Sequence, residues 1–319
     1  MAAGLAAFLR CRSILPQMKK IQITLVSVIA FCLGIGLVSP TNATDTTTDQ
    51  LNGTGIIVNY TEIIPPLPKA KVKSYLIVNL SSGEVLAAKN PHKQLPPAST
   101  IKALTAITLL DKLDPARSYT VRRSDAQMYG SEVGIVQGRK YTIEQLWYGL
   151  LLPSANDAAM ALANANGGVS KTVSEMNKTA QALGAKNTVA KTPHGLDITG
   201  QVTTAFDLAL IGRAAINNEV YRKYSRTTRY VFPRVGRNAV DVEIANTNKL
   251  LTSYPGLIAG KTGFTSKARN CYVGAARRDG QIILISFLGA YSGRDKVATE
   301  LFDWGFAVNG FITPVGKLP

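Results

Sequence analysis

Ala98-Ser99-Thr100-Ile101-Lys102 opens the stretch that decides the fold and the chemistry of this chain. Pro96-Pro97 stands just before it and blocks any helix upstream. Downstream, apolar side chains recur at helical spacing, and they are Ile101, Leu104, Ile107, Leu110 and Leu113. This pattern predicts a buried helix over 99–113 that begins at the serine.

Ser99 and Lys102 are three residues apart, so on a helix they lie one turn apart on one face. At a helix N-terminus, free backbone N–H groups and the helix dipole favour negative charge developing on the serine. Burial lowers the pKa of a lysine, and a neutral Lys102 could take the Ser99 proton. The pair therefore fits a nucleophile and base for acyl transfer, although a serine cap followed by a surface lysine is the commoner origin of this spacing.

Two further motifs favour the catalytic interpretation of Ser99 and Lys102 over the structural one. Ser154-Ala155-Asn156 follows a long apolar helix and Pro153, which places it in a loop. Gly260-Lys261-Thr262-Gly263-Phe264 ends a strand-like run. Taken singly, the first reads as a cap for the next helix and the second as a plain turn. Each of the three patterns occurs once, in this order, on a helix start, a loop and a strand, so their joint occurrence favours an active site.

Strand patterns lie on both sides of a helical region. The expected strands are 74–80, 84–88, 229–232, 240–244, 257–264, 271–276 and 281–288, with a helix over 295–306 at the end. Helical patterns dominate between about 111 and 220. This order predicts an α+β fold, with one antiparallel sheet built from both ends of the chain and an inserted, mostly helical subdomain.

The N-terminus has the pattern of an export signal. Basic residues up to Lys20 precede an apolar run over 21–38, and small residues end it at Ala43. We expect residues 1–43 to be a cleaved signal peptide. An uncleaved anchor is the alternative, because roughly 18 apolar residues approach the length of a membrane span. Either way, the rest of the chain is expected to work outside the cytoplasm, at the cell wall or the outer face of the membrane.

The remaining boundaries follow from composition. Translation could start at Met1 or at Met18, from which the signal reads more normally. The stretch 44–71 is rich in Thr, Asn and Pro and is expected to be a linker. Residues 72–319 are expected to form the catalytic domain.

The charge and the scarcity of metal ligands limit the partners. Lys and Arg total 36 against 20 Asp and Glu, and a net charge of +16 predicts attraction to an anionic wall polymer or a membrane surface. Nucleic acid is not expected for an exported protein.

Only Cys271 lies outside the signal, so no internal disulfide is expected. His92 and His194 are the only histidines and form no cluster, so neither a metal nor another cofactor is expected.

The three motifs together resemble the set that marks the penicillin-binding protein and serine β-lactamase superfamily. The resemblance extends over about 72–310 and is closest to the low-molecular-mass D-alanyl-D-alanine carboxypeptidases. Further stretches that carry it include Leu95-Pro96-Pro97-Ala98-Ser99, Pro193-His194-Gly195-Leu196-Asp197, Asn246-Thr247-Asn248-Lys249-Leu250-Leu251 and Trp304-Gly305-Phe306. It implies a β-lactamase/transpeptidase-like fold, an antiparallel sheet flanked by helices with the active site in a cleft beside the helical subdomain.

The resemblance also implies the residues that perform acyl transfer. Ser99 would be the nucleophile and Lys102 the base. Ser154 and Lys261 would pass the proton to the leaving amine. His194 could imitate a member of a Ser-His-Asp triad, but its His-Gly-Leu-Asp context favours a structural loop role.

Substrate binding is implied for a second set of residues. Asn156 would hold the peptide backbone of the substrate, and the backbone N–H of Phe264, beside Gly263, would form an oxyanion hole with that of the nucleophile. Thr262 and Arg294 would bind the terminal carboxylate. A cation there makes independent sense, because a carboxypeptidase must recognise a free carboxylate.

The activity implied by the resemblance is removal of the terminal D-alanine from peptidoglycan stem peptides, through an acyl-enzyme on Ser99 that β-lactams would trap. A D,D-endopeptidase acting on cross-links and a non-catalytic wall-binding protein are the alternatives.

No Glu-x-x-Leu-Asn lies between Ser154 and Lys261. Class A β-lactamases use that element to activate the deacylating water, so efficient penicillin hydrolysis is not expected. The chain ends soon after Trp304, so any anchoring is expected to use the N-terminus.

Overall fold

The computed structural model describes residues 50–234, 240–291 and 293–319. The expected signal peptide or anchor over 1–43 lies outside these ranges. Among the described residues, no helix is both long and apolar enough to cross a bilayer.

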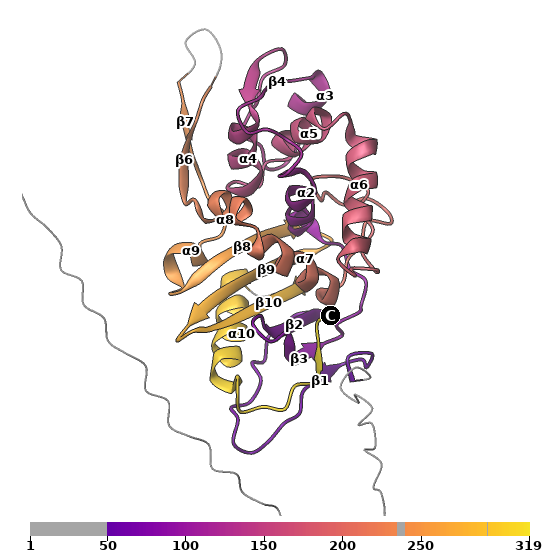
Figure 1. Ribbon diagram of the computed structural model, residues 1–319, viewed down its shortest axis with the longest axis vertical. Coiled ribbons are helices and arrows are strands. Elements are labelled where there is room, and N and C mark those ends of the chain that lie inside the picture. The colour runs from indigo at the N-terminus through magenta and orange to yellow at the C-terminus, as the bar shows by residue number, and fades with distance from the viewer. Residues whose placement is uncertain (1–49, 235–239, 292) are drawn as a thin grey trace, which may run out of the picture. The chain divides into compact units, whose positions relative to one another are not determined.

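One seven-stranded antiparallel sheet forms the centre of the described fold (Figure 1). In spatial order its strands are β1 (Ile56–Ile57), β3 (Glu84–Lys89), β2 (Ser74–Asn79), β10 (Gln281–Ala290), β9 (Arg269–Arg278) and β8 (Leu257–Thr265), and β11 (Gly316–Lys317) pairs with β3. β2 and β10 are neighbours, with Ile77 opposite Ile285. The predicted sheet built from both ends of the chain is therefore confirmed.

Helices cover both faces of this sheet. α7 (Ala205–Asn217) packs on one face and α10 (Arg294–Val308) on the other (Figure 1). Because side chains alternate along a strand, Leu76 belongs to the core that includes α7, and its neighbour Ile77 belongs to the core that includes α10. Each face of β2 is thus buried, which explains why its middle residues 75–78 are apolar without a break.

The helical subdomain is inserted between β3 and β8, as predicted. Its 3₁₀ helix is η1 (Ala98–Ile101), and the helices placed around it and beyond are α2 (Lys102–Leu109), α3 (Arg123–Ala126), α4 (Ile143–Leu151), α5 (Asn156–Ala165), α6 (Val169–Ala182), α8 (Glu219–Arg226) and α9 (Leu250–Ser253). A short hairpin of β4 (Ser118–Thr120) and β5 (Lys140–Thr142) leads into α4. The Thr142 hydroxyl accepts from Gln145 N at 3.2 Å and Gln145 Oε1 accepts from Thr142 N at 2.9 Å, so a capping box begins α4.

Two elements differ from the predictions. The helix expected over 99–113 begins as the 3₁₀ turn η1 and is α-helical only over Lys102–Leu109. The strands β6 (Arg229–Phe232) and β7 (Val242–Ala245) exist but pair only with each other, in a separate two-stranded sheet. Most residues of this hairpin are exposed or half-buried, so it has only one weakly buried face to place against the helices.

The linker expected over 44–71 is corrected for its described part. Over 50–71 the chain is packed on the body, because Leu51 and Ile64 are 3% and 5% exposed. Ile56 pairs with Lys89 in the sheet, and Trp304 Nε1 donates to the Pro65 carbonyl at 2.9 Å. Burial of a few apolar side chains is enough to hold this stretch on the core. Its overall composition is polar, and composition therefore did not indicate that these side chains are buried.

Gly212 sets the distance between α7 and the sheet. A Cβ at this position would lie 2.2 Å from Val273 Cγ2 on β9. We expect Gly212→Ala to lower the free energy of unfolding by about 1–2 kcal/mol, because overpacking outweighs the helix propensity gained. Gly293→Ala is the matched control, since a Cβ there meets nothing within 4 Å. Denaturant unfolding of both variants measures this, and equal stability of the two would contradict the close packing.

Candidate active site

A pocket of about 180 Å³ opens where η1, the loop before α5 and β8 meet. The side chains that line it are those of Ser99, Ser131, Ser154, Thr247, Thr262, Phe264 and Arg294, together with Gly263. Three segments that are far apart in the sequence thus bring their motif residues to one place. None of the described lining residues is acidic, so the pocket favours an anionic group.

Lys102 lies beneath Ser99 and is fully buried. Its Nζ donates to Ser99 Oγ at 3.0 Å, to Asn156 Oδ1 at 2.7 Å and to the His194 carbonyl at 2.7 Å. The amide and carbonyl oxygens can only accept, whereas the serine hydroxyl can also donate. In the neutral amine, the two remaining N–H groups therefore stay on Asn156 and His194, and the lone pair faces the Ser99 hydroxyl.

The surroundings of Lys102 favour that neutral form. Burial and the charge of Lys261 hold the pKa of Lys102 well below its usual value, and the charge of Asp157 opposes them only in part. A neutral amine 3.0 Å from a hydroxyl is the arrangement that a general base needs.

A second serine–lysine pair lies across the pocket. Lys261 Nζ donates to Ser154 Oγ at 2.7 Å and to the Thr262 carbonyl at 3.0 Å. Burial first, and then the charge of Arg294, lower the pKa of Lys261 to about 7. The backbone of Ser154 has a φ of 66°, a left-handed conformation rare for a residue other than glycine. The turn before α5 therefore holds the hydroxyl against Lys261 at the cost of backbone strain.

β8 approaches Ser99 closely because residue 263 is glycine. A Cβ on Gly263 would lie 2.9 Å from Thr100 N and 3.0 Å from Ser99 N. This close approach leaves Phe264, which is 60% exposed, at the rim of the pocket. The backbone nitrogen of Ser99 and the backbone of β8 thus lie close together beside the pocket.

Arg294 and Thr262 form the far wall. Thr262 Oγ1 lies 2.8 Å from Thr247 Oγ1, and Arg294 Nη2 donates to the Thr247 carbonyl at 2.9 Å. Arg294 Nε also donates to Asp295 at 2.8 Å. A guanidinium has five N–H donors, so others stay available to a ligand.

Asn156 and Asp157 tie the start of α5 to the opposite loop. Asn156 Nδ2 donates to the Tyr129 carbonyl at 2.7 Å, which orients its oxygen toward Lys102. The buried Asp157 carboxylate accepts N–H bonds from residues 133–135 at 2.9–3.2 Å. This network holds Ser131 in the wall of the pocket.

Sequence reasoning missed two lining residues. Thr247 lies in the Asn-Thr-Asn stretch that carries the family resemblance, and that stretch could have indicated it. Ser131 belongs to no motif, and only the fold brings it to the pocket. His194 uses its backbone carbonyl at the site, while its Nδ1 accepts from Leu196 N at 3.1 Å. Across the described part of the chain, no group of three His, Cys, Asp or Glu could hold a metal ion.

The two buried lysines make stability depend on pH. Lys261 has a folded pKa of about 7 against the usual 10.5, so the unfolded chain binds more protons between these values and stability rises with pH there. Lys261→Met should reduce that rise by up to about 1.4 kcal/mol per pH unit. Denaturant unfolding from pH 7 to pH 10 measures the slope. An unchanged slope in the variant would show that Lys261 is not desolvated, and Lys178→Met, an exposed lysine, is the control.

Comparison with known proteins shows the family of this chain. The family model for D-alanyl-D-alanine carboxypeptidases of peptidase family S11 matches residues 61–291. The chain is 42% identical over 252 residues to the carboxypeptidase DacB2 of Mycobacterium tuberculosis, covering 76% of this chain and 85% of that one. It is 33% identical over 278 residues to DacA of Escherichia coli K12, covering 82% and 67%.

Solved structures show the same fold. A Mycobacterium tuberculosis D-alanyl-D-alanine carboxypeptidase superposes with a TM-score of 0.75 at 41% identity, covering 81% of this chain and 98% of that one. The Streptomyces K15 DD-transpeptidase superposes with a TM-score of 0.71 at 30% identity, covering 76% and 100%. The chain therefore belongs to the S11 family of D-alanyl-D-alanine carboxypeptidases.

Proposed function

We propose that this chain is an exported serine carboxypeptidase that removes the terminal D-alanine from peptidoglycan stem peptides. The observation that supports it most is the fully buried Lys102 amine 3.0 Å from Ser99 Oγ, with its other two partners able only to accept. The family membership supports the substrate class. The wall-facing location rests on the N-terminal pattern and on the family.

In the proposed acylation, Ser99 Oγ attacks the carbonyl carbon of the penultimate D-alanine while its proton passes to Lys102. Negative charge then develops on the carbonyl oxygen, which the N–H groups of Ser99 and Phe264 would stabilise. Such a donor is typically worth a hundredfold or more in rate. Preorganised donors suit this role because they need no reorganisation when the charge appears.

Collapse of the intermediate breaks the bond to the last D-alanine, whose amine must gain a proton. Lys261 donates to Ser154 Oγ at 2.7 Å, so the pair can deliver one. Its pKa of about 7 lets Lys261 give up a proton near neutral pH. Thr262 and Arg294, which line the pocket, would hold the terminal carboxylate, and Asn156 would bind the peptide backbone. Water then hydrolyses the ester and frees Ser99.

Labelling with a fluorescent penicillin tests the nucleophile. β-Lactams mimic the D-Ala-D-Ala bond, so the full chain should take up a stable label and Ser99→Ala should take up none. Ser81→Ala, an exposed serine outside the pocket, should label fully. An unlabelled but folded native chain would contradict acylation and favour the wall-binding alternative, whereas rapid release of the label would indicate a weak β-lactamase.

Lys102→Arg tests the base. Arginine keeps a positive charge at all accessible pH values and cannot accept the Ser99 proton, so the labelling rate should fall by roughly 10²–10⁴. Lys178→Arg, on the exposed face of α6, is the matched control. Equal labelling rates would exclude Lys102 as the base.

Product analysis separates carboxypeptidase from endopeptidase activity. A stem pentapeptide should release free D-alanine, and cross-linked muropeptides should stay intact. Release of monomers from the cross-linked substrate, without D-alanine from the pentapeptide, would favour the endopeptidase. Because one similar structure is that of a DD-transpeptidase, an added amine acceptor would reveal transfer to an amine.

A further inference from the structure

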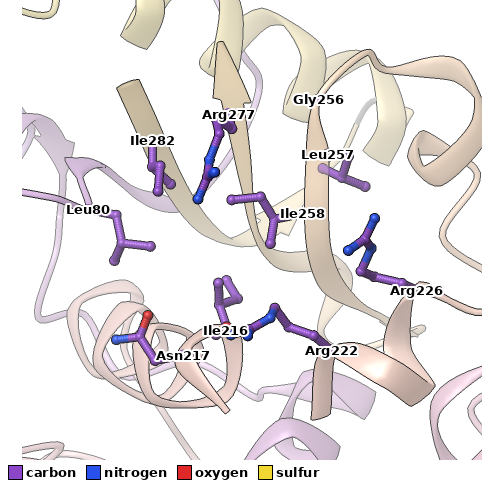
Figure 2. A pocket seen from close by; sticks show the side chains of 10 residues that line it. All are labelled: Leu80, Ile216, Asn217, Arg222, Arg226, Gly256, Leu257, Ile258, Arg277 and Ile282. Atoms are coloured by element: carbon purple, nitrogen blue, oxygen red, sulfur yellow. Dashed lines mark hydrogen bonds between the residues drawn. The ribbon is translucent and has the colours of Figure 1, made fainter. Parts of the chain in front are cut away.

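A second and larger hollow, of about 490 Å³, lies where α8 and the end of α7 meet the first residues of β8 (Figure 2). It shares no lining residue with the pocket at Ser99. Leu257 and Ile258 begin β8 here, and Thr262 reaches the active site farther along the same strand. At about 3.3 Å per residue, the two openings are roughly 15 Å apart along the strand.

Three arginines surround this hollow, Arg222 and Arg226 from α8 and Arg277 from β9 (Figure 2). Arg222 Nη1 donates to the Ile216 carbonyl at 2.6 Å, which fixes that guanidinium at the wall. Within residues 50–234, 240–291 and 293–319, the guanidinium groups of Arg226 and Arg277 have no hydrogen-bond or ion-pair partner. No described lining residue is acidic.

Little nearby negative charge offsets these three cations. Glu219 Oε1 lies 3.5 Å from Arg222 Nη2, but its side chain is 90% exposed, so water weakens the pair. The Glu144 carboxylate pairs with Lys223, the next position of α8, at 2.7 Å, so it is engaged by that lysine and not by the three arginines. The hollow therefore presents positive charge that is uncompensated by the described residues.

Apolar side chains form the floor between the arginines. Ile216 is buried, and four others are only half-buried, namely Leu80, Leu257, Ile258 and Ile282 (Figure 2). Gly256 shapes one rim: its φ is +82°, its carbonyl accepts from Arg277 N at 2.8 Å, and a Cβ would lie 2.0 Å from Arg277 O. A side chain at 256 is thus excluded, which keeps this rim of the hollow free.

We propose that this hollow binds an anionic amphiphile, a phosphate ester with a short alkyl portion. A guanidinium matches a phosphate with paired, charge-assisted hydrogen bonds, and three arginines line this hollow. The half-buried floor gains free energy only from a ligand that also covers apolar surface. A polyanion without an apolar portion would leave the apolar floor exposed to water. The arginines and the apolar floor together therefore favour a ligand that has both a phosphate and an alkyl portion. The proposal is independent of the reaction at Ser99.

Hexyl phosphate is the probe, with inorganic phosphate and hexanol as its two halves. Isothermal titration of the full chain should show hexyl phosphate binding at least about tenfold more tightly than either half, because two buried methylene groups suffice for that gain. Arg226→Gln and Arg277→Gln should each raise the Kd for hexyl phosphate by about tenfold. Arg139→Gln, an exposed arginine just before β5 and outside the hollow, carries the same charge change and should bind normally.

Ile258→Ala separates the floor from general basicity. This substitution should weaken the binding of hexyl phosphate and leave the binding of inorganic phosphate unchanged, because it removes apolar surface alone. Penicillin labelling of Ser99 should be unaffected in the arginine variants, which reports that they are folded. Hexyl phosphate binding no tighter than inorganic phosphate, or equal binding by Arg277→Gln and Arg139→Gln, would overturn the proposal.

Flotation with vesicles then identifies the source of the ligand. If the chain binds vesicles of phosphatidylglycerol and phosphatidylcholine, but not phosphatidylcholine alone, and the arginine variants do not, the ligand is a membrane lipid. If hexyl phosphate binds and the arginine variants float like the native chain, the ligand is a soluble organic phosphate.

Discussion

The arrangement of the candidate active site depends on the hydrogen bonds of one buried group, the amine of Lys102. Its three hydrogen bonds reach Ser99 on η1, Asn156 at the start of α5 and the carbonyl of His194 in the loop after α6. A lysine without such partners would be costly to bury. The same bonds that make burial tolerable also hold Ser99, the Asn156 amide and the loop at His194 in one arrangement. The chemistry and the packing of this region therefore share one side chain.

A second constraint is the proximity of two buried lysines. Burial, and then the charge of Lys261, lower the pKa of Lys102, whereas burial, and then the charge of Arg294, lower that of Lys261. Three cationic groups in a row cannot all keep their protons in a dry site, so the innermost one is favoured to be neutral. Burial favours the neutral form of Lys102 first and the charge beside it second, and the neutral form is the one that a general base needs.

β8 links the active-site pocket to the hollow lined by arginines. Its end carries Lys261, Thr262 and Gly263 to Ser99, and its beginning forms the apolar floor beside Arg222 and Arg277. Both openings favour negative charge, which agrees with a net charge of +16 for the chain. They differ in kind, since the first is small and polar and the second is larger with an apolar floor. The excess charge is therefore organised into distinct surfaces.

Sequence alone determined the sheet built from both chain ends, the helical insertion and the motif residues, because periodicity and short spacing are local properties. It did not show that 50–71 packs on the body, that η1 is a 3₁₀ turn, or that Ser131 joins the pocket. Nor could it show Arg277 beside Arg222, which lie on different elements. These features depend on contacts between distant segments, and only the tertiary structure brings such segments within bonding distance.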